Sequence, residues 1–324
     1  MKKLLIIIIP IIFLSLLGLG TYLMFFAPVA SSNEIQVFVV SENRENFDDA
    51  KKLEEQKFIT NAKAYKFLVN NFADGRSIEP GGYKLSQNMN AWQIMKKVSG
   101  KPDLVWFRQS FCVRKEQLGE YLADTLKWNS NRLNSWNSLY KNDKPDYFEG
   151  VYYPDTYLIP LDESAQDVAQ RFINRFNKKF TPLANDFAAK NIKWTTGIKI
   201  ASLIAREAAG ASDMKLISGI IWNRLDKGMP LQIDATMQYT LGKNENGSWW
   251  GRIDLTQKQS DSPYNSYVHK GLPPTPICSP NIDAIEAALN PETTDCLFYL
   301  HDGNKQIHCA KTYKEHLANI RKYL

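Results

Sequence analysis

The sequence predicts a mixed α+β protein with an N-terminal transmembrane helix, and three observations support this prediction. An uncharged apolar segment follows two lysines at the N-terminus. Short strand-like and helix-like segments then alternate up to about residue 125, and from about residue 145 longer helical patterns are joined by proline-bearing loops. Of the 324 residues, 44% are hydrophobic and 23% charged, which is typical of globular chains, and the length suits about two domains.

Residues 4–30 form the predicted membrane segment, with Lys2 and Lys3 before it and no further charge until Glu34. A helix crosses a bilayer with about 20 apolar residues, whereas a secretory signal has an apolar core of about 7–15 residues. We therefore expect an uncleaved anchor in the lipid bilayer, with a signal peptide as the main alternative. The two lysines favour a cytoplasmic N-terminus, which would leave the rest of the chain outside the cytoplasm.

The segment from 34 to about 125 reads as small α+β units with short connections. Apolar, β-branched runs predict strands, and apolar residues at helical spacing, such as Trp92, Met95 and Val98, predict helices. We expect strands within 34–40, 80–86 and 103–109, and helices within 46–56, 60–71, 89–100 and 113–127.

After residue 145 the pattern changes. The aromatic, proline-bearing stretch 147–160 has no clear period and predicts an ordered loop. A helix with Ser212 as N-cap and Gly228 just beyond its end is expected, and Thr312 with Glu315 has the spacing of a capping box. The remaining expected elements are helices near 164–180, 195–209 and 279–291 and two strands around the Gly-Asn turn at 303–304.

Several function classes lack their usual marks. The excess of 40 Lys and Arg over 34 Asp and Glu is mild, and no basic stripe is interleaved with aromatic residues, so we do not expect nucleic acid as a partner. The sequence has no G-x-S-x-G, Walker, G-x-G-x-x-G or H-E-x-x-H motif. These absences argue against serine hydrolases, nucleotide-binding enzymes and zincins.

The cysteines and histidines give no clear metal motif. With no C-x-x-C, the cysteines do not suggest a zinc knuckle; in an oxidising compartment they could pair in three ways, and the sequence does not choose. His301 and His308 flank the predicted hairpin turn and could face each other, holding a metal with Cys309 or Asp302. Two histidines in a sheet or at the surface are the commoner outcome. The four cysteines are Cys112, Cys278, Cys296 and Cys309.

Glu207 is the main candidate for chemistry. It shares one helical face with three apolar residues that lie seven, four and three positions before it, Ile200, Leu203 and Ile204. Burial would raise the pKa of this carboxyl and keep it protonated, as a general acid at a glycosidic oxygen requires. An ion pair with Arg206 or Arg224 is the alternative, and periodicity alone favours it.

A glycoside hydrolase of the usual type needs a second carboxylate roughly 5–9 Å from the first. Asp234, Glu149 and Asp155 lie in loop-like contexts and could supply it. A mechanism in which a hydroxyl of the sugar itself attacks would need Glu207 alone.

Five strings in order and spacing strongly resemble the endolytic murein transglycosylases, the MltG or YceG-like group. They are "EGVYYPDTYLIP", "ASLIAREA", "NRLDKGMPLQIDATMQYTLG", "YNSYVHKGLPPTPICSPNIDAIEAALNP" and "LFYLHDGNKQIHCAKTYKEHLANI". The resemblance covers nearly the whole chain and is densest over 147–320. It implies an anchor at 1–33, a LysM-like α+β module at 34–144 and a mixed α+β catalytic domain at 145–324.

The resemblance also implies an activity. Such proteins cleave the MurNAc–GlcNAc β-1,4 bond within peptidoglycan glycan strands and leave 1,6-anhydro-MurNAc ends. The glutamate that matches their catalytic position is Glu207, which would act first as acid and then as base. Weaker implied contacts with substrate fall on Glu149, Gln232, Asp234, Tyr264, Asn265 and Tyr267.

Neither a cofactor nor a metal is expected. The chain is expected in the plasma or inner membrane as a single-pass protein, with its catalytic domain in the periplasm. The family's link to ending strand growth suggests work beside peptidoglycan synthesis complexes. A non-catalytic cell-wall binding or scaffold protein, and a muramidase-type hydrolase with a second carboxylate, stay open as alternatives.

Overall fold

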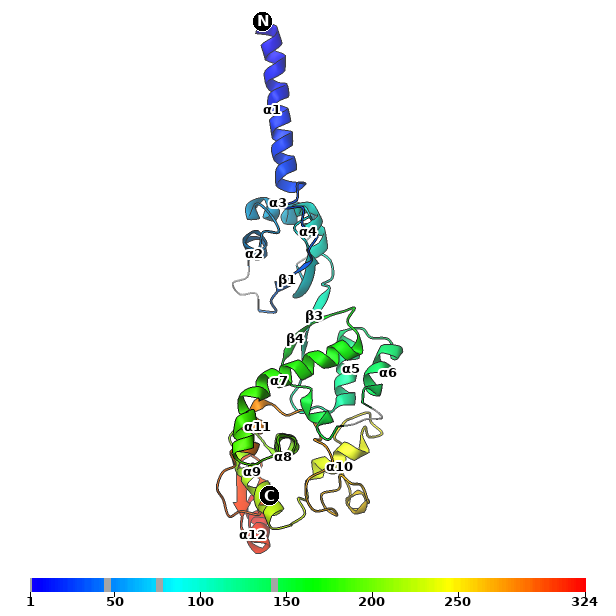
Figure 1. Cartoon of the computed structure of the whole chain (residues 1–324), viewed down its shortest axis with the longest axis vertical. Helices are drawn as coiled ribbons and strands as arrows, with labels where there is room; N and C mark the ends of the chain where they lie inside the picture. The colour runs from blue at the N-terminus through cyan, green and yellow to red at the C-terminus, as the bar shows by residue number, and fades with distance from the viewer. Residues whose placement is uncertain (1, 44–47, 74–77, 141–144) are drawn as a thin grey trace. The chain divides into compact units, whose positions relative to one another are not determined.

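The computed structural model describes residues 2–43, 48–73, 78–140 and 145–324, with side chains from residue 8 onward (Figure 1). It confirms a mixed α+β fold with one N-terminal apolar helix. The described chain forms two compact units, the first made of Met1–Phe107 and Tyr157–Glu163, the second of Arg108–Thr156 and Ser164–Leu324. The chain therefore leaves the first unit, returns to it for a few residues and leaves it again.

The first element is α1 (Lys2–Phe25). Its stretch Ile8–Phe25 is long and apolar enough to cross a membrane, and none of that stretch is buried within the protein. Such a helix fits the predicted anchor, although a signal sequence passes the same test.

A small sheet organises the first unit. Its strand order is β1-β2-β3-β4, and β1 runs antiparallel to β2 with Phe38 opposite Tyr83. Both of these side chains are fully buried, and they pack with Leu53 and Ile94 from the helices. The elements are β1 (Gln36–Val40), α2 (Asp49–Glu55), α3 (Ala62–Phe72), β2 (Gly81–Leu85), α4 (Ala91–Val98), β3 (Leu104–Arg108) and β4 (Thr156–Pro160).

The predicted loop at 147–160 is partly wrong, because its last five residues form β4. Tyr157 and Ile159 alternate with more exposed neighbours, so the strand buries one face. The sequence pattern is too short to reveal this, since Pro154 lies just before the strand and Pro160 is its last residue.

Helices dominate the second unit, and α8 packs against α7, α9, α10 and α11. The unit comprises α5 (Lys115–Thr125), α6 (Ser130–Ser138), η1 (Phe148–Val151), α7 (Ala165–Ala189), α8 (Trp194–Glu207), α9 (Met214–Asp226), α10 (Asp234–Leu241), η2 (Gln257–Gln259), α11 (Ile282–Leu289), β5 (Phe298–His301), β6 (Ile307–Ala310) and α12 (Tyr313–Tyr323).

The division between the units differs from the predicted boundary between 144 and 145. The described residues 108–140, which include α5 and α6, belong to the second unit. Trp136 of α6 explains why: it is fully buried, and its ring lies 5.4 Å from Tyr152 and 6.3 Å from Phe172. These contacts join α6 to η1 and α7, so this segment shares their core.

Two helices differ from prediction at their ends. α7 continues through Pro182 to Ala189 because Phe176, Phe180 and Phe187 stack in the core and outweigh the proline. The N-cap of α9 is Asp213 rather than Ser212. The predicted glycine at Gly228, with φ +60°, and the capping box at Thr312 are both present.

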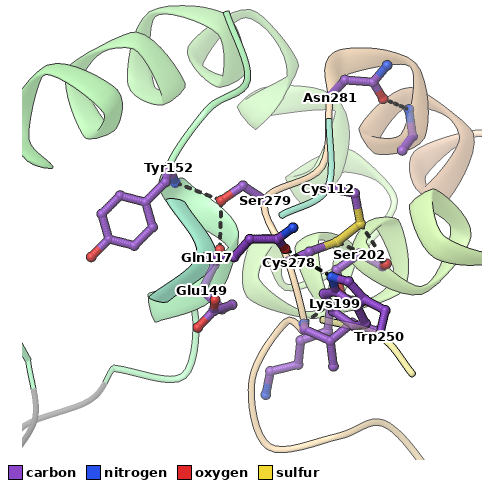
Figure 2. The surroundings of a disulfide bond; sticks show 12 residues. Cys112, Gln117, Glu149, Tyr152, Lys199, Ser202, Trp250, Cys278, Ser279 and Asn281 are labelled. Atoms are coloured by element: carbon purple, nitrogen blue, oxygen red, sulfur yellow. Dashed lines mark hydrogen bonds between the residues drawn. A yellow bond between two sulfur atoms is a disulfide. The ribbon is translucent and has the colours of Figure 1, made fainter. Parts of the chain in front are cut away.

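The four cysteines form two disulfides, Cys112–Cys278 and Cys296–Cys309. The first joins residues 166 positions apart next to α8, where both sulfurs lie near the carbonyl oxygen of Ser202 (Figure 2). The second spans 13 positions and ties β6 to the residues that lead into β5. The structure thus selects one of the three possible pairings.

Candidate functional site

Glu207 is the last residue of α8. The three apolar residues predicted to share its face, Ile200, Leu203 and Ile204, are fully buried. Ala208 then takes an extended conformation and ends the helix. The apolar face therefore anchors α8 in the core, while its terminal carboxyl, which is half-buried, reaches the edge of that core.

A pocket of about 480 Å³ opens at this carboxyl. Two of the residues predicted to contact substrate, Gln232 and Tyr267, line it together with Glu207. The full lining comprises Glu207, Arg224, Leu231, Gln232, Lys258, Tyr267, Phe298, Tyr299, Tyr313 and His316. The predicted acid therefore faces a mixed aromatic and polar surface.

Tyr299 holds one oxygen of the acid. Its hydroxyl donates a hydrogen bond of 2.5 Å to Oε2 of Glu207. Among the described residues, no other side chain is hydrogen-bonded to this carboxyl, so Oε1 is left for a ligand. Burial and the Glu207 carboxylate raise the pKa of Tyr299 well above its ordinary value, so the phenol stays protonated as a donor.

Burial raises the pKa of Glu207 above its ordinary value of 4.5, and the charge of Asp234 acts in the same direction. The Tyr299 hydrogen bond and the charges of His301 and Arg206 oppose this rise without cancelling it. The position of Glu207 at the C-terminus of a helix also disfavours its negative charge. The site therefore favours the protonated acid.

The hairpin of β5 and β6 positions Tyr299. The residue lies opposite Cys309 in the antiparallel register, and Cys309 is bonded to Cys296 just before β5. Tyr299 and His301 share one face of the strand because side chains alternate. The disulfide therefore fixes the strand that carries the partner of Glu207.

Gln232 and Asp234 reach the surface through an alternating segment. Leu231 and Ile233 are buried, whereas Gln232 and Asp234 between and after them are exposed. Gln232 has φ +55°, a left-handed conformation that is uncommon for residues with a side chain. Its N–H donates to the carbonyl of Ser266 at 2.9 Å, which helps to hold this conformation. Strain of this kind is often found at functional sites.

Tyr267 belongs to a polar group beside the acid. Its hydroxyl donates to Oδ1 of Asp234 and accepts from Nζ of Lys258 at 2.9 Å. Lys258 also pairs with Asp234 at 3.1 Å. The three side chains fix one another, so the Tyr267 ring is held at the wall of the pocket.

The structure does not bring Tyr264 and Asn265 to the pocket. Asn265 is fully buried, and its Nδ2 donates to the carbonyls of Lys258 and Ser260 while its Oδ1 accepts from the N–H of Tyr267. The Tyr264 ring packs against Tyr239 at 5.0 Å. These residues shape the loop that presents Tyr267.

Glu149 also lies away from the pocket. Its side chain is 0% exposed, and its oxygens accept hydrogen bonds from the N–H of Lys115 and the hydroxyl of Tyr239. Its backbone carbonyl accepts from Ser279, which follows Cys278 (Figure 2). Burial raises the pKa of Glu149 to about 7, with the charge of Glu116 acting in the same direction.

His301 and His308 do not face each other across the hairpin. His301 pairs in register with Ile307, so His308 points to the opposite face. His301 bonds to Asp213 at 2.7 Å, and His308 bonds to Asp302 at 3.0 Å. Within the described part of the chain, no group of three or more His, Cys, Asp or Glu side chains is placed to hold a metal.

Sequence reasoning missed several pocket residues. Tyr299, 92 positions after Glu207, is the most important because it bonds directly to the acid. The alternation in "LFYLHDG" contained a usable signal, since it puts Tyr299 on the same face as His301. The other lining residues that were not predicted to contact substrate are Arg224, Leu231, Lys258, Phe298, Tyr313 and His316.

The comparisons with known proteins agree on one family. A model of the YceG-like family matches residues 38–322. An endolytic murein transglycosylase of Bacillus subtilis is 27% identical over 294 residues, which are 84% of this chain and 80% of the relative. One from Streptococcus pneumoniae is 30% identical over 177 residues, 54% of this chain and about a third (32%) of the relative's length.

A solved structure gives the same result. The crystal structure of a yceG-like protein from Listeria monocytogenes is 27% identical to this chain, with a TM-score of 0.58. The match covers 89% of this chain and 99% of the other.

Proposed function

The chain belongs to the YceG-like family, and from its acid site we propose a membrane-anchored endolytic lytic transglycosylase of peptidoglycan. Its substrate is the β-1,4 bond between MurNAc and GlcNAc within glycan strands, and the new end is 1,6-anhydro-MurNAc. The relatives named endolytic murein transglycosylases support the reaction class.

One observation carries the assignment of the acid. Glu207 joins a half-buried, raised-pKa carboxyl to a pocket of about 480 Å³, and one of its oxygens has no hydrogen-bonding side chain among the described residues. A general acid needs both a proton at the working pH and access to the leaving oxygen. Glu207 combines the two.

In the first step, the protonated Glu207 gives its proton to the oxygen that bridges MurNAc and GlcNAc. The bond from C1 of MurNAc to that oxygen breaks, and the GlcNAc side leaves with a hydroxyl. Positive charge develops on the MurNAc ring as the bond breaks. Glu207 is left as a carboxylate, which the Tyr299 hydrogen bond stabilises.

In the second step, the Glu207 carboxylate takes the proton from the C6 hydroxyl of the same MurNAc. The C6 oxygen attacks C1 and closes the 1,6-anhydro ring. The carboxyl is protonated again and ready for the next cycle, so no second carboxylate and no water are consumed. One residue thus acts as acid and then as base.

Tyr299 is a positioning residue in this scheme. It fixes Oε2, so that Oε1 faces the pocket, and it lowers the energy of the carboxylate formed in the first step. Without it the acid would be harder to ionise and free to rotate.

Gln232, Asp234 and Tyr267 are proposed to contact the glycan. The exposed amide of Gln232 suits sugar hydroxyls or N-acetyl groups, and the face of the Tyr267 ring suits the apolar face of a pyranose. Glu149, Tyr264 and Asn265 act indirectly, by holding the segments behind the pocket.

The cellular setting follows from α1. We assign Ile8–Phe25 as a single membrane span with the N-terminus in the cytoplasm and the catalytic unit outside it. We assign the small α+β unit that precedes the catalytic unit, residues 34–107 with 157–163, as the LysM-like module. In this position the enzyme would cut newly made glycan strands beside the peptidoglycan synthesis complexes.

Mass spectrometry of digested peptidoglycan tests the reaction. The proposal predicts new 1,6-anhydro ends from the full-length protein. New reducing ends would instead identify a hydrolase, for which Asp234, whose charge acts on Glu207, is the candidate second carboxylate. Absence of any cut by folded protein would favour a binding or scaffold role.

A further inference from the structure

Aromatic side chains from three helices gather where α1 ends. The Phe25 ring lies 6.3 Å from that of Phe67 on α3, and the Phe26 ring lies 6.2 Å from that of Trp92 on α4. Phe72, the last residue of α3, packs edge-on against Trp92 at 5.3 Å. We call Phe26, Phe67, Phe72 and Trp92 the aromatic collar.

Three of the four collar residues are exposed to an extent unusual for aromatic side chains, whereas Trp92 is half-buried beside them. Phe67 is 55% exposed, Phe72 50% and Phe26 44%. The same helices bury Tyr65, Leu68 and Ile94 in the core of this unit, whereas these three phenylalanines remain exposed. A cluster of exposed aromatic side chains on one face marks an interaction surface.

The position of the collar identifies the partner. The apolar stretch of α1 runs to Phe25, so a bilayer that holds this stretch has its outer interface at that residue. Phe67 contacts Phe25 itself, and Trp92 contacts the next residue. The backbone carbonyl of Phe26 also accepts a hydrogen bond from Asn90, the N-cap of α4.

The composition of the collar suits lipid headgroups and the upper acyl chains. Tryptophan and other aromatic rings concentrate at this depth, and lysines beside them pair with anionic headgroups. Lys96 lies 5.3 Å over the Trp92 ring, and the exposed Lys63 precedes Phe67 by one helical turn.

We propose that the α3–α4 face of the first unit sits on the outer leaflet of the membrane, with the aromatic collar inserted at the lipid–water interface. This inference rests on the proposed membrane span. The collar continues the surface of α1 into the folded unit, so the unit is held against the membrane instead of swinging on a free tether.

Fluorescence quenching by brominated lipid tests this contact. Full-length protein is reconstituted in vesicles of phosphatidylcholine and phosphatidylglycerol, with or without bromine on the acyl chains. The emission lost in Trp92→Phe isolates Trp92. The matched control is Trp106→Phe, since Trp106 is half-buried like Trp92 but lies in the sheet of the same unit, where it donates a hydrogen bond to the carbonyl of Val40.

The proposal predicts that brominated lipid removes most of the Trp92 emission and leaves that of Trp106 unchanged. Phe67→Ser with Phe72→Ser, both at exposed positions, should reduce the quenching of Trp92 without unfolding the unit. If the protein resists alkaline carbonate extraction but Trp92 is not quenched, the inference is wrong and the proposed span stands. Light scattering that finds two copies joined through the collar would give this same result. Extraction by carbonate would overturn the proposed span, and the inference with it.

Discussion

Two carboxyl groups in the second unit, Glu207 and Glu149, share a raised pKa but differ in their exposure and in their hydrogen-bond donors. Glu149 is fully enclosed, with a donor on each oxygen, from Lys115 and Tyr239. Glu207 has one donor, Tyr299, and opens onto a pocket. A perturbed pKa therefore does not identify the reactive acid by itself; access by a ligand separates the two.

Each carboxyl also has its own disulfide. Cys112–Cys278 joins the two segments around Glu149, since Lys115 follows Cys112 by three residues and Ser279 follows Cys278. Cys296–Cys309 instead ties the hairpin that brings Tyr299 to Glu207. The first cross-link supports the core, and the second supports the strand that carries the partner of the proposed acid.

The largest expected effect is on the activity of Glu207→Gln. The amide cannot supply a proton, so peptidoglycan cleavage should fall about 10²–10⁴-fold, the usual range for a general acid. The free energy of unfolding should not fall, because the amide removes a carboxyl that is costly to ionise at neutral pH. Muropeptide release and urea unfolding measure the two quantities, and a strong loss of stability would make Glu207 a structural residue.

Removal of each disulfide should give the next largest effects, and these should differ between the region around Glu149 and the region around Glu207. The loop-entropy model predicts a loss of about 5 kcal/mol for Cys112→Ser with Cys278→Ser and about 3 kcal/mol for Cys296→Ser with Cys309→Ser. The second pair should also lower activity per folded molecule, because Tyr299 loses its fixed strand. Equal stability losses with activity unchanged in both would contradict the division of roles.

Glu149→Gln should act on stability. Its amide would point one NH₂ group at a donor, so the free energy of unfolding should fall by about 1–3 kcal/mol, with activity per folded molecule retained.

The contribution of Glu149 to the free energy of unfolding should depend on pH. Since the pKa of Glu149 is about 7 in the folded protein, above its unfolded value, the proton it gains stabilises the fold at acid pH. This contribution is lost as pH rises through about 7 and should be missing in Glu149→Gln. Urea unfolding at several pH values measures it, and identical pH profiles for the two proteins would argue against it.

Tyr299→Phe should give the smallest effect. One hydrogen bond to the Glu207 carboxylate is lost, so activity should fall about tenfold. Because that bond lowers the pKa of Glu207, its loss should move the alkaline fall of activity to higher pH. A pH–rate profile checks this, and a shift to lower pH would show that Tyr299 does not stabilise the carboxylate.

Local signals predicted much of the fold. Helix periodicity located α8 and its buried stripe, and capping residues located the start of α12. β4 was not predicted because the strand has only five residues and ends in a proline. α7 continues past Pro182 because the packing of its phenylalanines outweighs the local break.

The prediction of the site from sequence was limited by contacts between residues far apart in the chain. Gln232 and Tyr267 were named from resemblance, and the structure brings both to the pocket of Glu207. The contact of Tyr299 with Glu207 and the Cys112–Cys278 disulfide join residues far apart in the chain, which periodicity cannot report. Glu149 had the same chemistry as a candidate acid, and only its enclosure distinguishes it.

The central claim is that burial raises the pKa of Glu207 above the ordinary carboxyl value while the carboxyl faces a pocket. Infrared titration of the wild type minus Glu207→Gln isolates the protonated carboxyl of this residue. The account predicts a band that persists above pH 4.5, the ordinary value, and that disappears only at higher pH. A band already lost below pH 4.5 would contradict it.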